Sequence, residues 1–405
     1  MKRRRTTSTP IARRRTPARS ATTRAQAPPY ALDGTLVTSA ALLAGLGIVM
    51  NYSTTAAMAI GEPIPPLALR HGLGVAFAAV VAVVCSRLPL VFWARISLPL
   101  YGLSVFLLAL TPFLGIEANG AQRWLAVPGL PISIQPSEPA RLFALLALAV
   151  LLATNTERGR PAPGALKTAL PLIGLPVGLL LLQPDFGSAV ILVATAGLVL
   201  FASGLPLRVL AAPGVVAALA ACAYVAAHPY ALARLRGFLD PWRHASDEGF
   251  QLVQSFVAFG RGGPFGVGIG DGRQKLSYLP EAHTDFILSV VAEELGLVGV
   301  LVVLGAFAAL ALAGLRIARR AKNPLSLLIA TGATATIVVP GAINAAVVMG
   351  WLPTTGLTLP FLSHGSNSLV CTAIALGILL RIGAREAPPA TERVRDASNR
   401  RWARA

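Results

Sequence analysis

Charged, aromatic and cysteine residues are all scarce in this chain. Of its 405 residues, 13% are charged and 6% are aromatic, whereas 55% are hydrophobic and the mean hydropathy is +0.66. So few charges exclude an ordinary soluble domain, in which about a quarter of the residues are charged. The three cysteines, Cys85, Cys222 and Cys371, show no metal-like spacing, so we expect small apolar packing residues and no disulfide framework.

The chain contains many long runs of apolar residues. A helix needs roughly 20 apolar residues to cross the hydrocarbon layer of a bilayer. Ten segments approach this length, at residues 33–51, 66–86, 91–114, 136–153, 167–182, 185–203, 208–227, 286–315, 324–350 and 366–383. The sequence therefore predicts an all-α polytopic membrane protein with ten transmembrane helices. We expect that the first is not a cleavable signal peptide, because its basic leader is long and it has no clear cleavage site.

The positions of the basic residues predict the orientation. Short loops rich in Lys and Arg stay cytoplasmic, and alternate loops carry Arg87, then Arg158, Arg160 and Lys167, then Arg208, then Arg316, Arg319, Arg320 and Lys322. Both termini are thus predicted to be cytoplasmic. Four segments then face outward: 115–135, 183–185, 228–285 and 351–365.

Most of the net charge of +18 lies in two tails, which gives the domain organisation. Residues 1–31 form a basic cytoplasmic tail that we expect to be disordered. Residues 32–383 form the membrane domain, and residues 384–405 form a second basic cytoplasmic tail. Attraction to anionic inner-leaflet lipid explains these tails better than nucleic-acid binding, because no aromatic or folded partner accompanies the basic clusters.

The large outer loop between the seventh and eighth spans, residues 228–285, is too long for a simple connection. It holds six cations, Arg234, Arg236, Arg243, Arg261, Arg273 and Lys275. These favour an anionic ligand such as phosphate, although a merely basic, solvated loop remains an alternative. The glycine-rich run 260–272 lacks a nucleotide-binding register, and we expect a tightly turning or flexible backbone there.

Acidic residues near the outer ends of the spans are the candidate chemical groups. Asp285 lies where this loop ends and the eighth span begins. A carboxylate at a bilayer boundary is energetically costly, so its presence there indicates a chemical role. Glu138 and Arg141 lie three apart at the start of the fourth span, so they share a helix face and can pair. Glu293 and Glu294 lie about 12 Å deeper than Asp285 at ~1.5 Å per residue, which indicates packing or coupling.

Together these motifs resemble the SEDS family of bacterial membrane proteins, the FtsW, RodA and SpoVE group. The resemblance extends from about residue 32 to 383. It rests on the runs GAQRWL at 120–125, QPSE at 135–138, QPDFG at 183–187, FLDP at 238–241, GFQLVQS at 249–255, LPEAHTDF at 279–286 and LPFLS at 359–363. The run 274–283 is similar to the division-type FtsW branch. Two departures are Arg141, where the family usually has Lys, and residues 363–368, which read SHGSNS in place of SYGGSS.

The resemblance implies a peptidoglycan glycosyltransferase that polymerises lipid II on the outer face of the bacterial cytoplasmic (inner) membrane, at the division septum. It further implies a class B penicillin-binding protein transpeptidase and other divisome proteins as partners. Asp285 matches the essential carboxylate, which we interpret as a general base. The other candidates for substrate binding are Arg123, Trp124, Glu138, Arg141, Arg261, Lys275, Glu281 and Ser363, with Arg123, Lys275 and Arg261 predicted to meet the diphosphate.

A divalent cation, Mg²⁺ or Mn²⁺, is the expected cofactor, shared between Asp285 and the substrate diphosphate. A site built by Glu281, His283 and Asp285 alone is less favoured, because their alternating spacing need not converge. Two other functions stay open. One is a flippase that moves lipid-linked sugars, and the other is a scaffold that only binds a transpeptidase.

Overall fold

The computed structural model describes residues 32–56, 64–118, 121–126, 129, 133–157, 160–161, 164–276 and 282–386, which belong to one compact unit. Tail 1–31, most of tail 384–405 and Glu281 lie outside these residues. The helices are α1 (Gly34–Ala56), α2 (Pro66–Arg87), α3 (Leu90–Leu114), α4 (Ser137–Thr154), α5 (Ala165–Leu182), α6 (Phe186–Ala202), α7 (Leu207–Ala227), α8 (Pro229–Leu239), α9 (Phe250–Gly262), α10 (Ile287–Arg320), α11 (Pro324–Val348) and α12 (Ser366–Glu386).

Nine of the described helices are long and apolar enough to cross a membrane. They correspond to nine of the ten predicted spans, which confirms a helical, multi-pass membrane architecture. The remaining predicted span is α6, an apolar helix of 17 residues. At ~1.5 Å per residue it is about 26 Å long, slightly shorter than the hydrocarbon layer.

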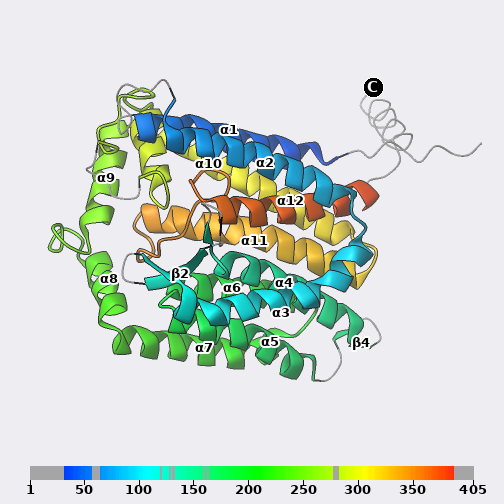
Figure 1. The fold of residues 1–405 in the computed structure, drawn as a ribbon. Coiled ribbons are helices and arrows are strands. Elements are labelled where there is room, and N and C mark those ends of the chain that lie inside the picture. The colour runs from blue at the N-terminus through cyan, green and yellow to red at the C-terminus, as the bar shows by residue number, and fades with distance from the viewer. Residues whose placement is uncertain are drawn as a thin grey trace, which may run out of the picture. The chain divides into compact units, whose positions relative to one another are not determined.

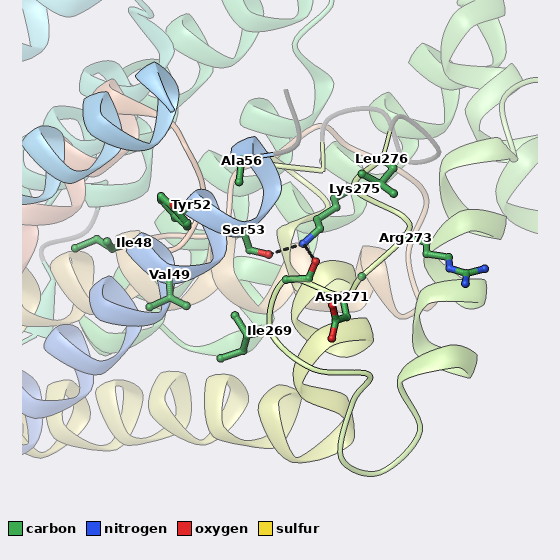
Figure 2. Close-up of a pocket in the computed structure, with 12 residues that line it drawn as sticks. Ile48, Val49, Tyr52, Ser53, Ala56, Ile269, Asp271, Arg273, Lys275 and Leu276 are labelled. Carbon is green, nitrogen blue, oxygen red and sulfur yellow. Dashed lines mark hydrogen bonds between the residues drawn. The ribbon is translucent and has the colours of Figure 1, made fainter. Parts of the chain in front are cut away.

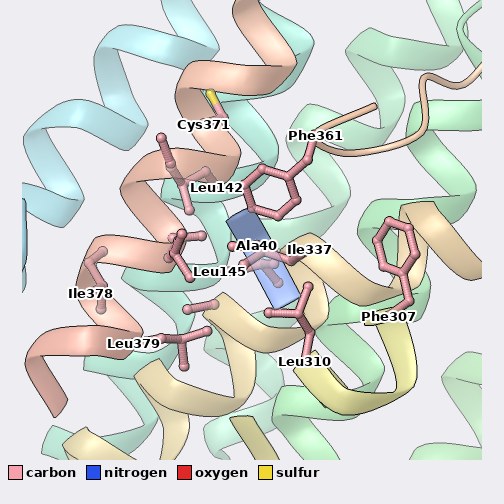
Figure 3. Packing of buried hydrophobic residues seen from close by; sticks show 14 of the residues in the cluster. Ala40, Leu142, Leu145, Phe307, Leu310, Ile337, Phe361, Cys371, Ile378 and Leu379 are labelled. Atoms are coloured by element: carbon pink, nitrogen blue, oxygen red, sulfur yellow. The ribbon is translucent and has the colours of Figure 1, made fainter. Parts of the chain in front are cut away.

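The apolar core lies where α1, α4, α10, α11 and α12 meet. Figure 3 shows buried side chains from these helices pointing toward one another, among them Ala40, Leu145, Leu310, Ile337 and Leu379. α12 packs on α2 and α11, and α10 packs on α1, α9 and α11. Of the cysteines, Cys85 and Cys371 are buried as expected, whereas Cys222 is exposed on α7, so its predicted packing role is wrong.

The predicted outer loop 228–285 contains two helices. Figure 1 shows α8 and α9 running across the ends of the other helices, and α9 packs on α10. The segment 115–135 also contains structure that the all-α prediction missed: strands β1 (Ile116–Ala118), β2 (Ala121–Ala126) and β3 (Ser133–Ile134) form an antiparallel sheet in the order β1-β2-β3. Strands β4 (Thr156–Glu157) and β5 (Arg160–Pro161) form a second small pair. Short strands of this kind carry too weak a pattern for sequence-based prediction.

α10 is broken near its start, at Gly296, whose φ is +67°. The glycine-rich segment, residues 263–272, lies against this break and supplies the missing backbone partners: Val267 N–H donates to the carbonyl of Glu293 at 2.9 Å, and Leu297 N–H donates to the carbonyl of Gly263 at 2.9 Å. The break therefore keeps its backbone groups paired within the protein, as burial in a membrane requires. The predicted tight turning of this run is confirmed at Gly266, whose φ is +80°.

Candidate active site

Asp285 lies in the turn just before α10, at the end of the bundle where α1 ends and α10 begins. We call this the Asp285 end. Its Oδ1 accepts a hydrogen bond from the Thr284 hydroxyl at 2.8 Å, and its side chain is partly buried. Its Oδ2 lies 3.8 Å from the position that a Cβ on Gly356 would occupy, so the loop 351–365 passes beside the carboxylate. A larger residue at position 356 would narrow the space next to Asp285.

The loop 351–365 supports the backbone of this turn. The Ser363 hydroxyl donates to the carbonyl of Thr284 at 2.5 Å and accepts from the N–H of Leu359 at 2.7 Å. The N–H of His364 donates to the carbonyl of His283 at 2.9 Å. Ser363 is buried, and both contacts are to backbone groups. The structure thus gives Ser363 a supporting position behind Asp285, and its contact with substrate stays a prediction.

A buried asparagine on α11 completes this support. Asn344 Nδ2 donates to the carbonyl of Asp285 at 2.7 Å and to the carbonyl of Leu357 at 2.6 Å, so it joins the Asp285 turn to the loop. On α1, Asn51 Nδ2 similarly donates to the carbonyl of Leu362 at 2.7 Å. Sequence analysis missed both residues. The signal was present, because an amide within an apolar span is costly unless it is hydrogen-bonded.

Arg123 and Trp124 lie on β2 at the same end of the bundle. The Arg123 guanidinium donates from Nε to the carbonyl of Gln183 at 3.3 Å and from Nη2 to the carbonyl of Pro184. Trp124, partly buried, is paired in the ladder with Ile116. Arg123 therefore ties the small sheet to the turn before α6, and its Nη1 makes no hydrogen bond to the described residues.

Glu138 and Arg141 form the predicted ion pair at the start of α4, with Oε1 and Nη2 2.5 Å apart. Arg141 Nη1 is buried without a hydrogen-bond partner among the described residues, and so is Oδ2 of Asp185, which caps α6 through its other oxygen. Asp185 is within electrostatic range of Arg141. Buried polar groups almost always have partners, so this cluster retains one donor and one acceptor for a polar ligand.

Arg261 and Lys275 are engaged by the two glutamates of α10. Arg261 Nη1 lies 2.5 Å from Glu293 Oε1, and Lys275 Nζ lies 2.7 Å from Glu294 Oε1. Sequence analysis placed both cations at the substrate diphosphate, but in the structure each is held by a carboxylate. Binding of phosphate by Lys275 would take the cation away from the buried Glu294 carboxylate, which is costly. We therefore place Arg123 and Arg141 ahead of Lys275 as candidates for the diphosphate, and the contact of Arg261 with it stays a prediction.

The metal prediction fits a site completed by substrate. Among the described residues, no three His, Cys, Asp or Glu side chains lie close enough to hold an ion. Glu281, one of the three predicted donors, lies outside those residues. Asp285 and the Thr284 hydroxyl supply hard oxygen donors. Magnesium commonly takes one or two protein carboxylates and completes its shell with phosphate and water.

Three histidine rings lie close together at the Asp285 turn, with His364 near both of the others. The centroid of His364 is 6.0 Å from that of His71 and 6.1 Å from that of His283. Burial lowers the pKa of His364 below its usual 6.5, and the charges of His283 and Arg70 lower it further. Folding therefore favours the neutral form of His364.

We expect this histidine to make the protein less stable in acid. A group whose pKa is depressed by folding binds its proton more readily in the unfolded chain, so stability falls as the pH drops below about 6.5, the pKa of the unfolded histidine. His364→Gln should lessen this loss while leaving stability at pH 8 nearly unchanged. Thermal unfolding in detergent between pH 5 and pH 8 measures the effect, and parallel pH profiles for both proteins would contradict it.

The chain is similar to known proteins over most of its length. Residues 34–387 match the family of cell cycle proteins that comprises FtsW, RodA and SpoVE. It is 40% identical over 356 residues to a protein of Halomonas elongata named "Probable peptidoglycan glycosyltransferase FtsW", covering 86% of this chain and 90% of that one. A protein of the same name from Alkalilimnicola ehrlichii is 43% identical over 358 residues, covering 87% and 89%.

Solved structures of the same kind are also similar. A chain of a peptidoglycan synthase complex, solved to explain how polymerization and crosslinking are coordinated, superposes with a TM-score of 0.73 at 32% identity. The alignment covers 88% of this chain and 98% of that one. The rod shape determining protein RodA of Thermus thermophilus superposes with a TM-score of 0.64 at 31% identity, covering 88% and 97%.

Proposed function

Because the chain belongs to the FtsW/RodA/SpoVE family of cell cycle proteins, we propose that it polymerises lipid II into glycan strands as a peptidoglycan glycosyltransferase. Its relatives named for this activity match it along nearly their whole length. These similarities do not favour the flippase alternative. The structural observation that carries the proposal is the support of Asp285, whose turn is fixed by Asn344 of α11 and by Ser363 of the loop 351–365.

The proposed reaction joins two lipid-linked sugars. The hydroxyl of the acceptor sugar attacks the anomeric carbon of the donor, and Asp285 takes the hydroxyl proton as the new carbon–oxygen bond forms. The bond between the anomeric carbon and the diphosphate oxygen breaks, and undecaprenyl diphosphate leaves with the electron pair. The leaving group needs no proton if cations neutralise its charge, so one carboxylate suffices where soluble glycosidases commonly use two.

Arg123 and Arg141 are our candidates for the cations that meet the diphosphate. Among the residues that the structure describes, Arg123 Nη1 makes no hydrogen bond, and Arg141 Nη1 is buried without a partner. A guanidinium offers two parallel N–H groups to phosphate oxygens, which suits a charged leaving group. Glu138 holds Arg141 in place. Trp124, partly buried next to Arg123, offers an aromatic face to a sugar ring or a prenyl chain.

A divalent cation held by Asp285 and the diphosphate would stabilise the negative charge of the leaving group. We therefore expect chelation with EDTA to reduce polymerisation about tenfold or more, and Mg²⁺ or Mn²⁺ to restore it. Gel-resolved glycan length before and after re-addition of each ion measures this. Full activity in excess EDTA would show that arginines alone neutralise the leaving group.

The membrane arrangement that goes with this function has ten spans, with α6 as the short sixth span. Both termini are cytoplasmic, and the Asp285 end faces outward, where lipid II is consumed. Arg316 and its ion-pair partner Asp33 lie at the opposite end, 3.6 Å apart, as the distribution of basic residues predicts. The division septum is the proposed location, and a class B penicillin-binding protein transpeptidase, with other divisome proteins, is the proposed partner.

Incubation of the purified protein with fluorescent lipid II and Mg²⁺ tests the function. We expect a ladder of glycan products, longer when the partner transpeptidase is present. A transporter would instead move labelled lipid II between the leaflets of a liposome and make no polymer. Absence of polymer with the partner present, together with transfer between leaflets, would overturn the proposal.

A further inference from the structure

A buried ion pair joins the segment before Asp285 to the helix after it. The Lys275 ammonium lies 2.7 Å from Glu294 Oε1, and the two side chains are 5% and 0% exposed. Lys275 Nζ also donates to the Ser53 hydroxyl at 2.8 Å and to the carbonyl of Gly270 at 2.7 Å. These three bonds use all three N–H groups of the ammonium.

The carboxylate of Glu294 also has several hydrogen-bond donors around it. It accepts from the Ser53 hydroxyl at 2.7 Å and from the N–H of Gly270 at 3.1 Å, in addition to Lys275. Figure 2 shows the Lys275 ammonium between Ser53 of α1 and the glycine-rich segment, in the wall of a cavity of about 990 Å³. The pair therefore connects three parts of the chain: α1, the glycine-rich segment and α10.

The neighbouring glutamate strengthens the same connection. Glu293 Oε1 accepts from the N–H of Arg273 and Oε2 from the N–H of Gln274, both at 3.0 Å. Residues 273–275 are thus fixed to residues 293–294 by both main chain and side chain. Asp285 lies between these two points along the chain, and the first turns of α10, from Ile287 to Glu294, join it directly to this ion pair.

We propose that Lys275 and Glu294 are positioning residues whose ion pair fixes the first turns of α10 against α1 and so holds Asp285 at the reacting sugars. The inference rests on the proposed function. A carboxylate that acts as a base must be kept within hydrogen-bond reach of the hydroxyl proton, and a small displacement of such a group lowers the rate strongly. An ion pair that clamps the first turns of α10 limits that displacement without touching the substrate.

A double-mutant cycle separates this role from direct binding of the diphosphate. Lys275→Met leaves the buried Glu294 carboxylate without its cationic partner. We expect kcat for lipid II polymerisation to fall about tenfold or more, and KM to change less than about threefold. In Lys275→Met/Glu294→Gln the buried charge is gone, and a neutral amide oxygen can still accept from Ser53 and Gly270. We expect the double variant to regain about fivefold in kcat over the single variant.

Lys322→Met is the matched control, because it removes the same type of side chain at an exposed position beyond the other end of α10. It should polymerise like the wild type. If Lys275 binds the diphosphate, the double variant will be no more active than Lys275→Met, and KM will rise in both. That result would overturn the positioning role.

Hydrogen exchange on the full-length proteins gives a readout that does not depend on activity. Amides of residues 282–286 should exchange about tenfold faster in Lys275→Met than in the wild type, and about as slowly as the wild type in Lys322→Met. Peptides from α11 should be unchanged in both variants. Unaltered exchange at 282–286 would refute the clamp even if the wild type polymerises lipid II, whereas failure of the wild type to polymerise would refute the function and leave the exchange result to decide the clamp.

Discussion

Asp285→Asn should abolish glycan polymerisation, with a loss of kcat of about 10² to 10⁴, the usual contribution of a positioned base. Asparagine has the same shape and can still accept the hydrogen bond that Thr284 donates, but it cannot take the proton of the acceptor hydroxyl. The fluorescent lipid II assay measures the loss. A thermal unfolding temperature close to that of the wild type would show that the loss is chemical.

Asp247→Asn is the control for this experiment. Asp247 is exposed between α8 and α9, where its carboxylate contacts only the neighbouring Ser246 among the described residues. The substitution makes the same change of charge and shape in the same outer segment, and should leave polymerisation intact. If Asp285→Asn makes polymer at the wild-type rate, Asp285 is not the base and a scaffold or a different catalytic group must be considered.

Gly262→Ala should cause a large loss of folding stability. A Cβ at this position would lie 1.8 Å from the carbonyl oxygen of Ala292, which belongs to the first part of α10. Two backbone segments would have to separate, and such overpacking costs about 3 kcal/mol or more. The separation would also disturb Glu293 and the break at Gly296, where the glycine-rich segment is hydrogen-bonded. Thermal unfolding and the yield of folded protein in detergent measure the effect.

Gly260→Ala provides a comparison two residues away on the same helix. A Cβ there would meet nothing within 4 Å, and alanine favours a helix interior over glycine by about 1 kcal/mol. This variant should be as stable as the wild type or slightly more stable. Equal unfolding temperatures for the two alanine variants would show that α9 and α10 are farther apart than the structure indicates.

The membrane architecture was predictable because a span must be apolar over its whole length, so each span appears in the sequence as a long run of apolar residues. Nine of the ten predicted segments correspond to helices that meet this standard. The Glu138–Arg141 pair was predictable for a similar local reason, since residues three apart share one helix face. Helices α8 and α9 were not predictable from the sequence. They are amphipathic segments of only 11 and 13 residues within a polar loop, and so short a hydrophobic pattern is a weak signal for a helix.

The ion-pair partners of the charged side chains in the large outer loop could not be predicted from the sequence. Arg261 and Lys275 were predicted to meet phosphate, yet they pair with Glu293 and Glu294. Those glutamates are 32 and 19 residues away along the chain, and no periodicity links them to their partners. A basic cluster in a sequence shows only that anions are favoured nearby, and the anion can be another side chain of the protein.

The sequence by itself determined the class of this protein, the family to which it belongs and the carboxylate at the start of the eighth predicted span. These follow from composition, order and local spacing, which need no knowledge of distant contacts. Only the tertiary structure decided which residues support Asp285. Asn344, Ser363 and Glu294 reach its segment from α11, the last loop and the interior of α10, because burial in an apolar bundle forces each polar group to find its partner across the fold.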